Sequence, residues 1–349
     1  MTDLVKRSFF LFLFAAGLSS CMEEVQLPPR SVASRLVVEG LITDGAPPYT
    51  VKLTFTGAYN SLLYGQNEIP VEGVAVSITE VGGRTVQLQQ DPITPFFYWQ
   101  RDPDLVGTVG KNHVLAVELV DGTRYVSDPE PLNPVPAIDR LYAEYRPRTN
   151  DDFSNPDYYE VLLDTQDPDK PGNYYRWSAY GYVPRFSTGE PRGFADICCQ
   201  YCFYPVYGSG SDVQSDALIN GKAISRRPIH ASPIYYPGQH FIEVRQYSFS
   251  KSAYQFWTRF EEQRKRTGSL FDPLPASIEG NVHDVNDPNR LVLGYFCASA
   301  VSTKRMIIPG DTLKVPRIEI KYGTEFVKDG NCQRVYSQGH LLAPENWLK

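Results

Sequence analysis

Short segments in which apolar and polar residues alternate recur along the first third of the chain, and they restrict the fold more than any other feature. The clearest of them cover residues 49–55, 74–80 and 113–119. Successive side chains of a β-strand point to opposite faces, so each segment predicts a strand with one buried face. Gly82-Gly83, which follows one such segment, is typical of a hairpin turn. We therefore expect a mainly β protein that begins with an immunoglobulin- or transthyretin-like β-sandwich over residues 35–130.

A proline-rich stretch at residues 131–136 marks the expected end of this domain. Strand-like segments resume beyond it, so residues 137–349 predict a second β-rich domain. Within that domain, residues 182–235 show little regular alternation and suggest a long irregular segment. The 23 tyrosines and 28 prolines of the chain also favour strands joined by turns.

One α-helix is expected near residues 251–267 of the second domain. Ser250 or Ser252 could form its N-cap. The apolar residues at helical spacing are Tyr254, Trp257 and Phe260. We interpret these aromatic side chains as core contacts of the helix.

The N-terminus has the features of a bacterial lipoprotein signal peptide. Two basic residues precede an apolar run over residues 9–18, and Ser19-Ser20-Cys21 follows it. Such a run is shorter than the about 20 residues that a membrane-spanning helix needs. We expect removal of residues 1–20, acylation of the Cys21 thiol with fatty acids such as palmitate, and a membrane linker over residues 21–34. The alternative is an ordinary signal peptide with a chance cysteine.

Two acidic residues, Glu23 and Glu24, follow the lipidated position almost directly. This pair resembles the acidic export signal by which Bacteroidota send lipoproteins to the outer face of the outer membrane. The pattern favours a cell-surface protein, although a solvated start of the linker is the alternative. The formal net charge of −6 and the lack of a basic tract argue against a nucleic-acid partner.

Five cysteines remain besides the lipidated one, and an exported chain can oxidise them to disulfides. They are Cys198, Cys199, Cys202, Cys297 and Cys332. Neighbouring cysteines rarely bridge each other, so we expect a long-range bridge from the cluster at residues 198–202 to Cys297 or Cys332. A zinc site is the alternative, but no histidine adjoins either of those two cysteines. We therefore expect disulfides and no metal.

The sequence predicts no catalytic residues and no cofactor. Residues 208–212 lack the spacing of a nucleophile elbow, and the five histidines are not paired as zinc ligands. Four aromatic residues of the expected irregular segment are candidates for contact with a ligand or partner. They are Tyr201, Phe203, Tyr204 and Tyr207. The alternative is that they fill a small core beneath the segment.

Several motifs occur in an order that resembles one family. They cover residues 37–43, 71–76, 254–275, 279–288 and 292–299. Together they resemble the Bacteroidota lipoprotein family catalogued as domain of unknown function 4249, over most of the mature chain. The resemblance implies an outer-membrane lipoprotein, often encoded beside TonB-dependent receptors, and it transfers no catalytic residue.

Three functions remain open at this point. The first is a surface lipoprotein that binds a ligand for, or docks onto, a TonB-dependent transporter in nutrient uptake. The second is a surface hydrolase of a polymeric substrate, and the third is a structural or adhesive surface protein. The missing catalytic spacing and the sandwich-like pattern favour the first.

Overall fold

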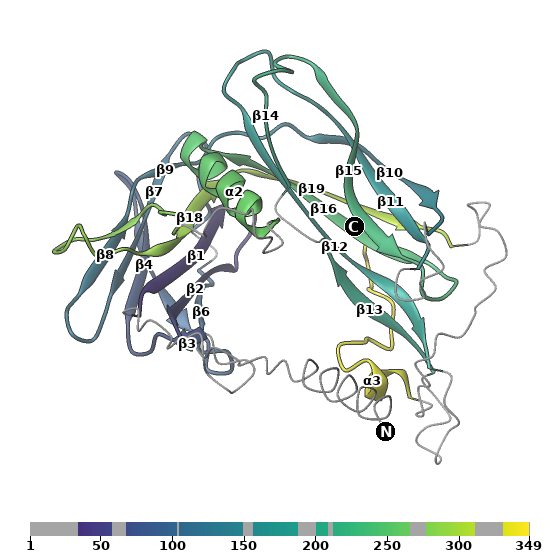
Figure 1. Ribbon diagram of the computed structural model, residues 1–349, viewed down its shortest axis with the longest axis horizontal. Coiled ribbons are helices and arrows are strands. Elements are labelled where there is room, and N and C mark those ends of the chain that lie inside the picture. Colours follow the sequence, from purple (N-terminus) through teal and green to yellow (C-terminus); the bar gives the residue numbers. More distant parts are fainter. Residues whose placement is uncertain are drawn as a thin grey trace, which may run out of the picture.

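The computed structural model describes most of the chain after residue 33. The described residues are 34–57, 68–102, 105–148, 156–187, 200–208, 212–265, 277–310 and 331–348. The expected signal peptide and linker, with Cys21, and the neighbouring Cys198 and Cys199 lie outside these residues. The protein is mainly β, as predicted, and helix α2 lies between two groups of strands (Figure 1).

The first group of strands forms one long sheet that surrounds one hydrophobic core. Its order is β17-β8-β7-β4-β5-β6-β2-β1-β18. The strands are β1 (Leu36–Thr43), β2 (Tyr49–Thr56), β4 (Ala75–Glu80), β5 (Thr85–Gln90), β6 (Phe97–Gln100), β7 (Asn112–Glu118), β8 (Arg124–Ser127), β17 (Val282–Asp284) and β18 (Leu293–Ser299). β3 (Glu68–Pro70) pairs with β2, and β9 (Glu130–Pro131) pairs with β7.

Alternation explains why these segments are strands. In β7 every second residue is buried, and Leu115 and Val117 join the same core as Val38 and Leu53 of the β1–β2 pair. Residues from both ends of the sheet therefore pack on each other, with β5 pairing to both halves. Gly82 has a φ of 79°, which places the β4–β5 turn in the left-handed region that favours glycine.

Two strands of the first sheet come from near the end of the chain. β18 runs parallel to β1, with Leu41 opposite Cys297, and β17 pairs with β8. Gly294 permits the parallel contact, because a Cβ atom there would lie 2.0 Å from the carbonyl oxygen of Val38. The sheets therefore do not follow the expected division into residues 35–130 and 137–349. The division of the chain into two domains at these residues stays a prediction.

The second group of strands forms two sheets that share a core. One has the order β10-β11-β15, and the other β13-β12-β16-β19, with β14 also on β12. The strands are β10 (Ile138–Arg146), β11 (Tyr158–Gln166), β12 (Tyr174–Phe186), β13 (Tyr201–Tyr207), β14 (Asp212–Ser215), β15 (Ala223–Pro233), β16 (His240–Phe249) and β19 (Val301–Ile308). Val161, Trp177 and Val244 are among the buried residues that join the two sheets.

The expectation of an irregular segment over residues 182–235 is wrong for much of that range. β12 continues to Phe186, and β13, β14 and β15 follow. Three of these strands contain proline, at Pro184 in β12, Pro205 in β13 and Pro228 in β15, and β15 changes register twice against β11. Prolines and register shifts interrupt the alternation by which strands are recognised in a sequence.

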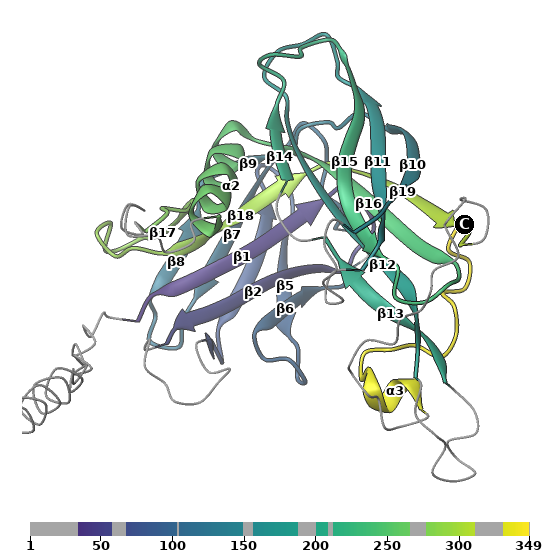
Figure 2. The same ribbon diagram turned by 45° about the vertical axis from the view of Figure 1, so that its right-hand side comes forward.

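Helix α2 (Lys251–Arg264) fills the space between the two groups of strands (Figure 2). The Ser250 side chain caps it by accepting a hydrogen bond from the amide of Ala253, which confirms the first of the two expected caps. Phe256 packs with Tyr295 of β18, while Phe249 of β16 belongs to the same cluster. The helix is thus buried against both groups of strands.

The C-terminal segment, residues 331–348, returns to the second group of strands. It contains the short helix α3 (Cys332–Val335), and Trp347 is buried with Phe203 and Phe241. The indole nitrogen of Trp347 donates a hydrogen bond to the carbonyl oxygen of Met306 at 3.2 Å. Among the described residues, no helix has the length and apolar character to cross a membrane.

Candidate functional site

The outer face of the β13-β12-β16-β19 sheet carries the best candidate for a binding site. Along β12, Tyr175 and Trp177 point into the core, so Arg176, Ser178 and Tyr180 point to the opposite face. Helix α2 covers one end of this face, and the C-terminal segment around Trp347 covers the other. A stretch of the sheet between these two covers stays open to solvent.

This open stretch forms a groove of about 510 Å³, which we call the arginine groove. It is lined by Arg176, Ser178, Ala179, Tyr180, Tyr207, Gly208, Arg245, Phe260, Glu261 and Arg264. The residues come from β12, β13, β16 and the last turns of α2. A second hollow of about 410 Å³ lies between Tyr182 and residues 340–344 of the C-terminal segment, and its lining is mainly apolar.

A buried carboxylate beneath the floor of the arginine groove holds Arg245, which lines the groove, and Arg305 of the neighbouring strand β19. Glu243 is fully buried, and its two oxygens lie 2.7 Å from Nε of Arg245 and 2.6 Å from Nε of Arg305. The strand register places these side chains together, because Glu243 of β16 lies opposite Tyr180 of β12 and Arg305 of β19. One carboxylate therefore orients two guanidinium groups.

A third ion pair lies on the wall that α2 provides. Arg264 contacts Glu261, one turn before it, at 2.8 Å, and about half of the Arg264 side chain is exposed. The charged residues that line the arginine groove are thus Arg176, Arg245, Arg264 and Glu261. Burial, and then the charge of Glu243, raise the pKa of Tyr180 above its ordinary value. The Tyr180 hydroxyl is therefore protonated at neutral pH and can donate a hydrogen bond.

The structure separates the four aromatic residues that the sequence proposed as contacts. Phe203 belongs to the core cluster with Phe241 and Trp347, and Tyr201 packs edge-on against Phe203 with ring centres 5.3 Å apart. Tyr204 lies against Tyr336 of the C-terminal segment. Only Tyr207 is largely exposed, at 70%, and it lines the arginine groove.

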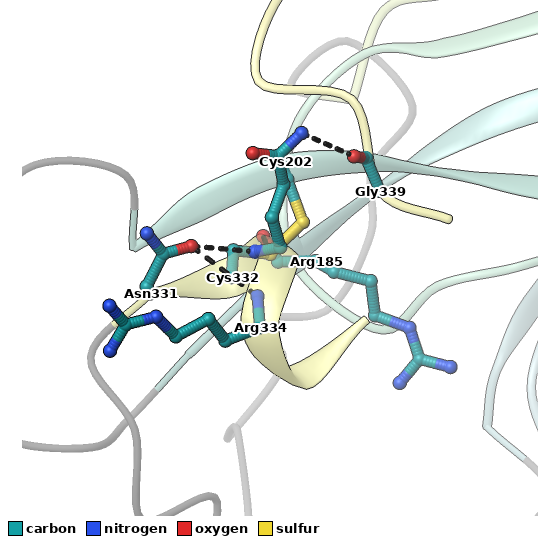
Figure 3. The surroundings of a disulfide bond; sticks show 7 residues. Arg185, Cys202, Asn331, Cys332, Arg334 and Gly339 are labelled. Carbon is teal, nitrogen blue, oxygen red and sulfur yellow. Dashed lines mark hydrogen bonds between the residues drawn. A yellow bond between two sulfur atoms is a disulfide. The ribbon is translucent and has the colours of Figure 1, made fainter. Parts of the chain in front are cut away.

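A disulfide joins Cys202 of β13 to Cys332 at the start of α3, across 130 residues of sequence (Figure 3). This is the long-range bridge that was expected from the cysteine cluster, with Cys332 as the partner. Cys297 is a buried free thiol, and burial raises its pKa to about 12. Asn331 caps α3 by accepting hydrogen bonds from the amides of Gln333 and Arg334 (Figure 3). The C-terminal segment is thereby fixed to β13.

Two polar clusters outside the arginine groove are buried. In the first, Ser232 and His240 are hydrogen-bonded at 2.7 Å, as a nucleophile and its base would be. Both are fully buried, so a substrate cannot reach them. Burial also lowers the pKa of His240 to about 3, and its imidazole is neutral. We assign this pair to the core.

The second buried cluster surrounds Glu130 of β9. Its carboxylate accepts hydrogen bonds from Ser250 at 2.8 Å and from Tyr295 at 2.5 Å. Asn281 also contacts it, at 3.4 Å, and bonds both backbone groups of Phe296 at 2.9 Å. Burial raises the pKa of Glu130. These contacts tie the N-terminus of α2 to β9 and β18, which is a structural role.

Sequence reasoning missed the arginine groove because its arginines are distant in the chain. Arg176, Arg245 and Arg264 belong to three different elements. The alternation in β12 was the one available signal, since it places Arg176, Ser178 and Tyr180 on one face. Among the residues that the structure describes, there is no cluster of three or more histidine, cysteine, aspartate or glutamate side chains that could hold a metal ion.

Comparison with known proteins assigns the chain to a family. The sequence model of the family described as domain of unknown function (DUF4249) matches residues 23–305, and the chain belongs to this family. The match includes β1 to β18 and the first five residues of β19. A search among curated proteins found no match.

Proposed function

We propose that this member of the DUF4249 family is a lipid-anchored protein of the outer-membrane surface that binds a ligand as an accessory of a TonB-dependent transporter. The arginine groove is the observation that supports binding most directly, because it is open and combines guanidinium groups with aromatic rings. The signal peptide with Cys21 supports the anchor, and Glu23 and Glu24 support display at the surface.

The chemistry of the arginine groove favours binding over hydrolysis. A glycosidase needs two carboxyl groups on either side of the bond that it cleaves. The lining of the groove contains one carboxylate, Glu261, and it contacts Arg264 at 2.8 Å. Glu243, beneath the floor, is buried and contacts two arginines. The arginines that these carboxylates orient can contact a ligand, whereas the two carboxylates are not placed as an acid and base pair.

Affinity purification from native outer membranes tests the accessory role. The full-length protein with a C-terminal tag, expressed at its natural level, should copurify a β-barrel transporter. An unrelated tagged lipoprotein of the same membrane is the control. Recovery of the protein without a transporter, under conditions that preserve membrane complexes, would contradict the accessory role.

Substitution of Cys21 tests the anchor. Cys21→Ala should abolish labelling with radioactive palmitate and release the protein from membranes or leave it unprocessed. Cys297→Ala, which removes the buried thiol of β18, should keep the label. A palmitate-labelled Cys21→Ala protein would refute the anchor.

Protease added to intact cells should degrade the protein if it is displayed at the surface, and alanines at Glu23 and Glu24 should protect it.

A further inference from the structure

The arginine groove carries positive charge on an acidic protein. The chain has a formal net charge of −6, yet three arginines and a single glutamate line the groove. Glu243 beneath the floor offsets only part of this charge, because its single negative charge is shared between Arg245 and Arg305. A local excess of positive charge attracts anionic ligands and repels cationic ones.

The guanidinium groups of Arg245 and Arg264 are oriented and still accessible. Nε of Arg245 contacts the buried Glu243 at 2.7 Å, and the Arg245 side chain keeps 44% of its surface exposed. Arg264 is held by Glu261 and is 47% exposed. The planar fork of arginine matches a carboxylate or sulfate group with two parallel hydrogen bonds. Such oriented arginines lose little side-chain freedom when they bind an anion.

Aromatic rings stand beside these charges. Tyr207 at the rim is 70% exposed, and Phe260 on α2 is 41% exposed. Tyr180 forms part of the floor, with the guanidinium carbon of Arg245 5.6 Å from its ring centre. Exposed rings of this kind offer flat apolar faces to flat apolar parts of a ligand. The groove therefore suits a ligand whose anionic groups are attached to rings.

We propose that the arginine groove binds an acidic polysaccharide, in which carboxylate or sulfate groups contact the arginines and sugar rings stack on Tyr207 and Phe260. The groove is open to solvent between α2 and the C-terminal segment, so acidic sugar units can enter it from the solvent side of the sheet. This inference rests on the proposed binding function and names its ligand class.

Calorimetry on the full-length protein in detergent tests this ligand class. The probes are polygalacturonate fragments for carboxylate, chondroitin sulfate for sulfate, and dextran as the neutral control. We expect binding of at least one acidic probe, no binding of dextran, and weaker binding at higher salt because exposed charges are screened. Equal binding of dextran and the acidic probes would overturn the proposal.

Matched substitutions then locate the site. Arg245→Gln should lower the affinity about tenfold or more, since a hydrogen bond to a charged group is lost. Arg84→Gln removes the same charge from an exposed side chain on the β4–β5 hairpin and should leave the affinity unchanged. Tyr207→Ala changes a largely exposed side chain, so it tests the groove without a risk to folding. It should also weaken binding.

The outcomes separate this inference from the proposed function. Equal losses in Arg245→Gln and Arg84→Gln would mean unspecific attraction and would overturn the inference. Copurification with a transporter together with no binding of any acidic probe would also overturn it, while the accessory role would stand. Binding of an acidic probe that Arg245→Gln and Tyr207→Ala weaken would support the inference even if no transporter copurified.

Discussion

Two buried histidines should make the second group of strands sensitive to acid. His230 of β15 and His240 of β16 are both buried, and burial lowers their pKa values to about 4 and about 3. Besides Ser232, the neighbours of His240 include the ring of Tyr159, with centres 4.9 Å apart, and His230 itself. No carboxylate is among these neighbours to stabilise a protonated imidazole.

The sign and size of the effect follow from proton linkage. An unfolded histidine has a pKa of about 6.5, so the unfolded chain binds more protons than the folded chain below that pH. The stabilisation is complete above about pH 6.5 and is lost as the pH falls toward the folded pKa values. Between about pH 7 and about pH 5, each histidine should reduce the free energy of unfolding by about 1.9 kcal/mol, and the pair by about 4 kcal/mol.

Urea unfolding followed by tryptophan fluorescence at both pH values measures this loss. His240→Asn keeps a polar atom near Ser232 and removes one titrating group, so the loss on acidification should become smaller by about 1.9 kcal/mol. His283→Asn, at a half-exposed imidazole, is the matched control and should behave as the parent does. If His240→Asn loses as much stability on acidification as the parent, the buried imidazole is not the cause and the reasoning fails.

Three other substitutions test contacts of the fold. Because burial raises the pKa of Glu130, the free energy of unfolding of the parent should fall as the pH rises above about 4.5, by at most about 1.4 kcal/mol per pH unit. Glu130→Gln should remove this fall, and equal pH profiles of urea unfolding for the two proteins would contradict the prediction. Replacing Cys202 and Cys332 by serine should cost at most about 5 kcal/mol, because the bridge closes a loop of 130 residues; a midpoint insensitive to reductant would argue against it. Trp347→Ala should cost about 3 kcal/mol and expose the C-terminal segment to protease, and unchanged proteolysis would show that Trp347 does not hold that segment.

Local patterns were enough to predict much of the fold. Alternation located β2, β4 and β7, because each has one face in the core and the other toward solvent. Ser250 and Ser252 were the two candidates for the start of α2, since only a few residue types cap a helix through the side chain, and Ser250 is the cap. The cysteine count predicted a long-range bridge and left its partner open, and the structure places Cys332 there.

Features that depend on distant pairing could not be predicted in this way. Nothing near residue 37 indicates that its strand neighbour lies at residue 293, because a parallel pair needs no local turn. The arginine groove is similar, since the register of β12 and β16 and the position of α2 together assemble it. The aromatic residues of β13 looked alike in sequence. Phe203 and Tyr207 lie on the same face of β13, but Trp347 packs on Phe203 and leaves Tyr207 exposed.

The parallel pairing of β1 with β18 also sets an order of events during synthesis. The ribosome makes Val37 long before Leu293, its partner across the sheet. Until β18 emerges, one edge of β1 exposes backbone groups that can pair with another chain. The first sheet is therefore completed late, after most of the second group of strands has been made. A fragment that ends at residue 130 would carry this open edge permanently and should aggregate.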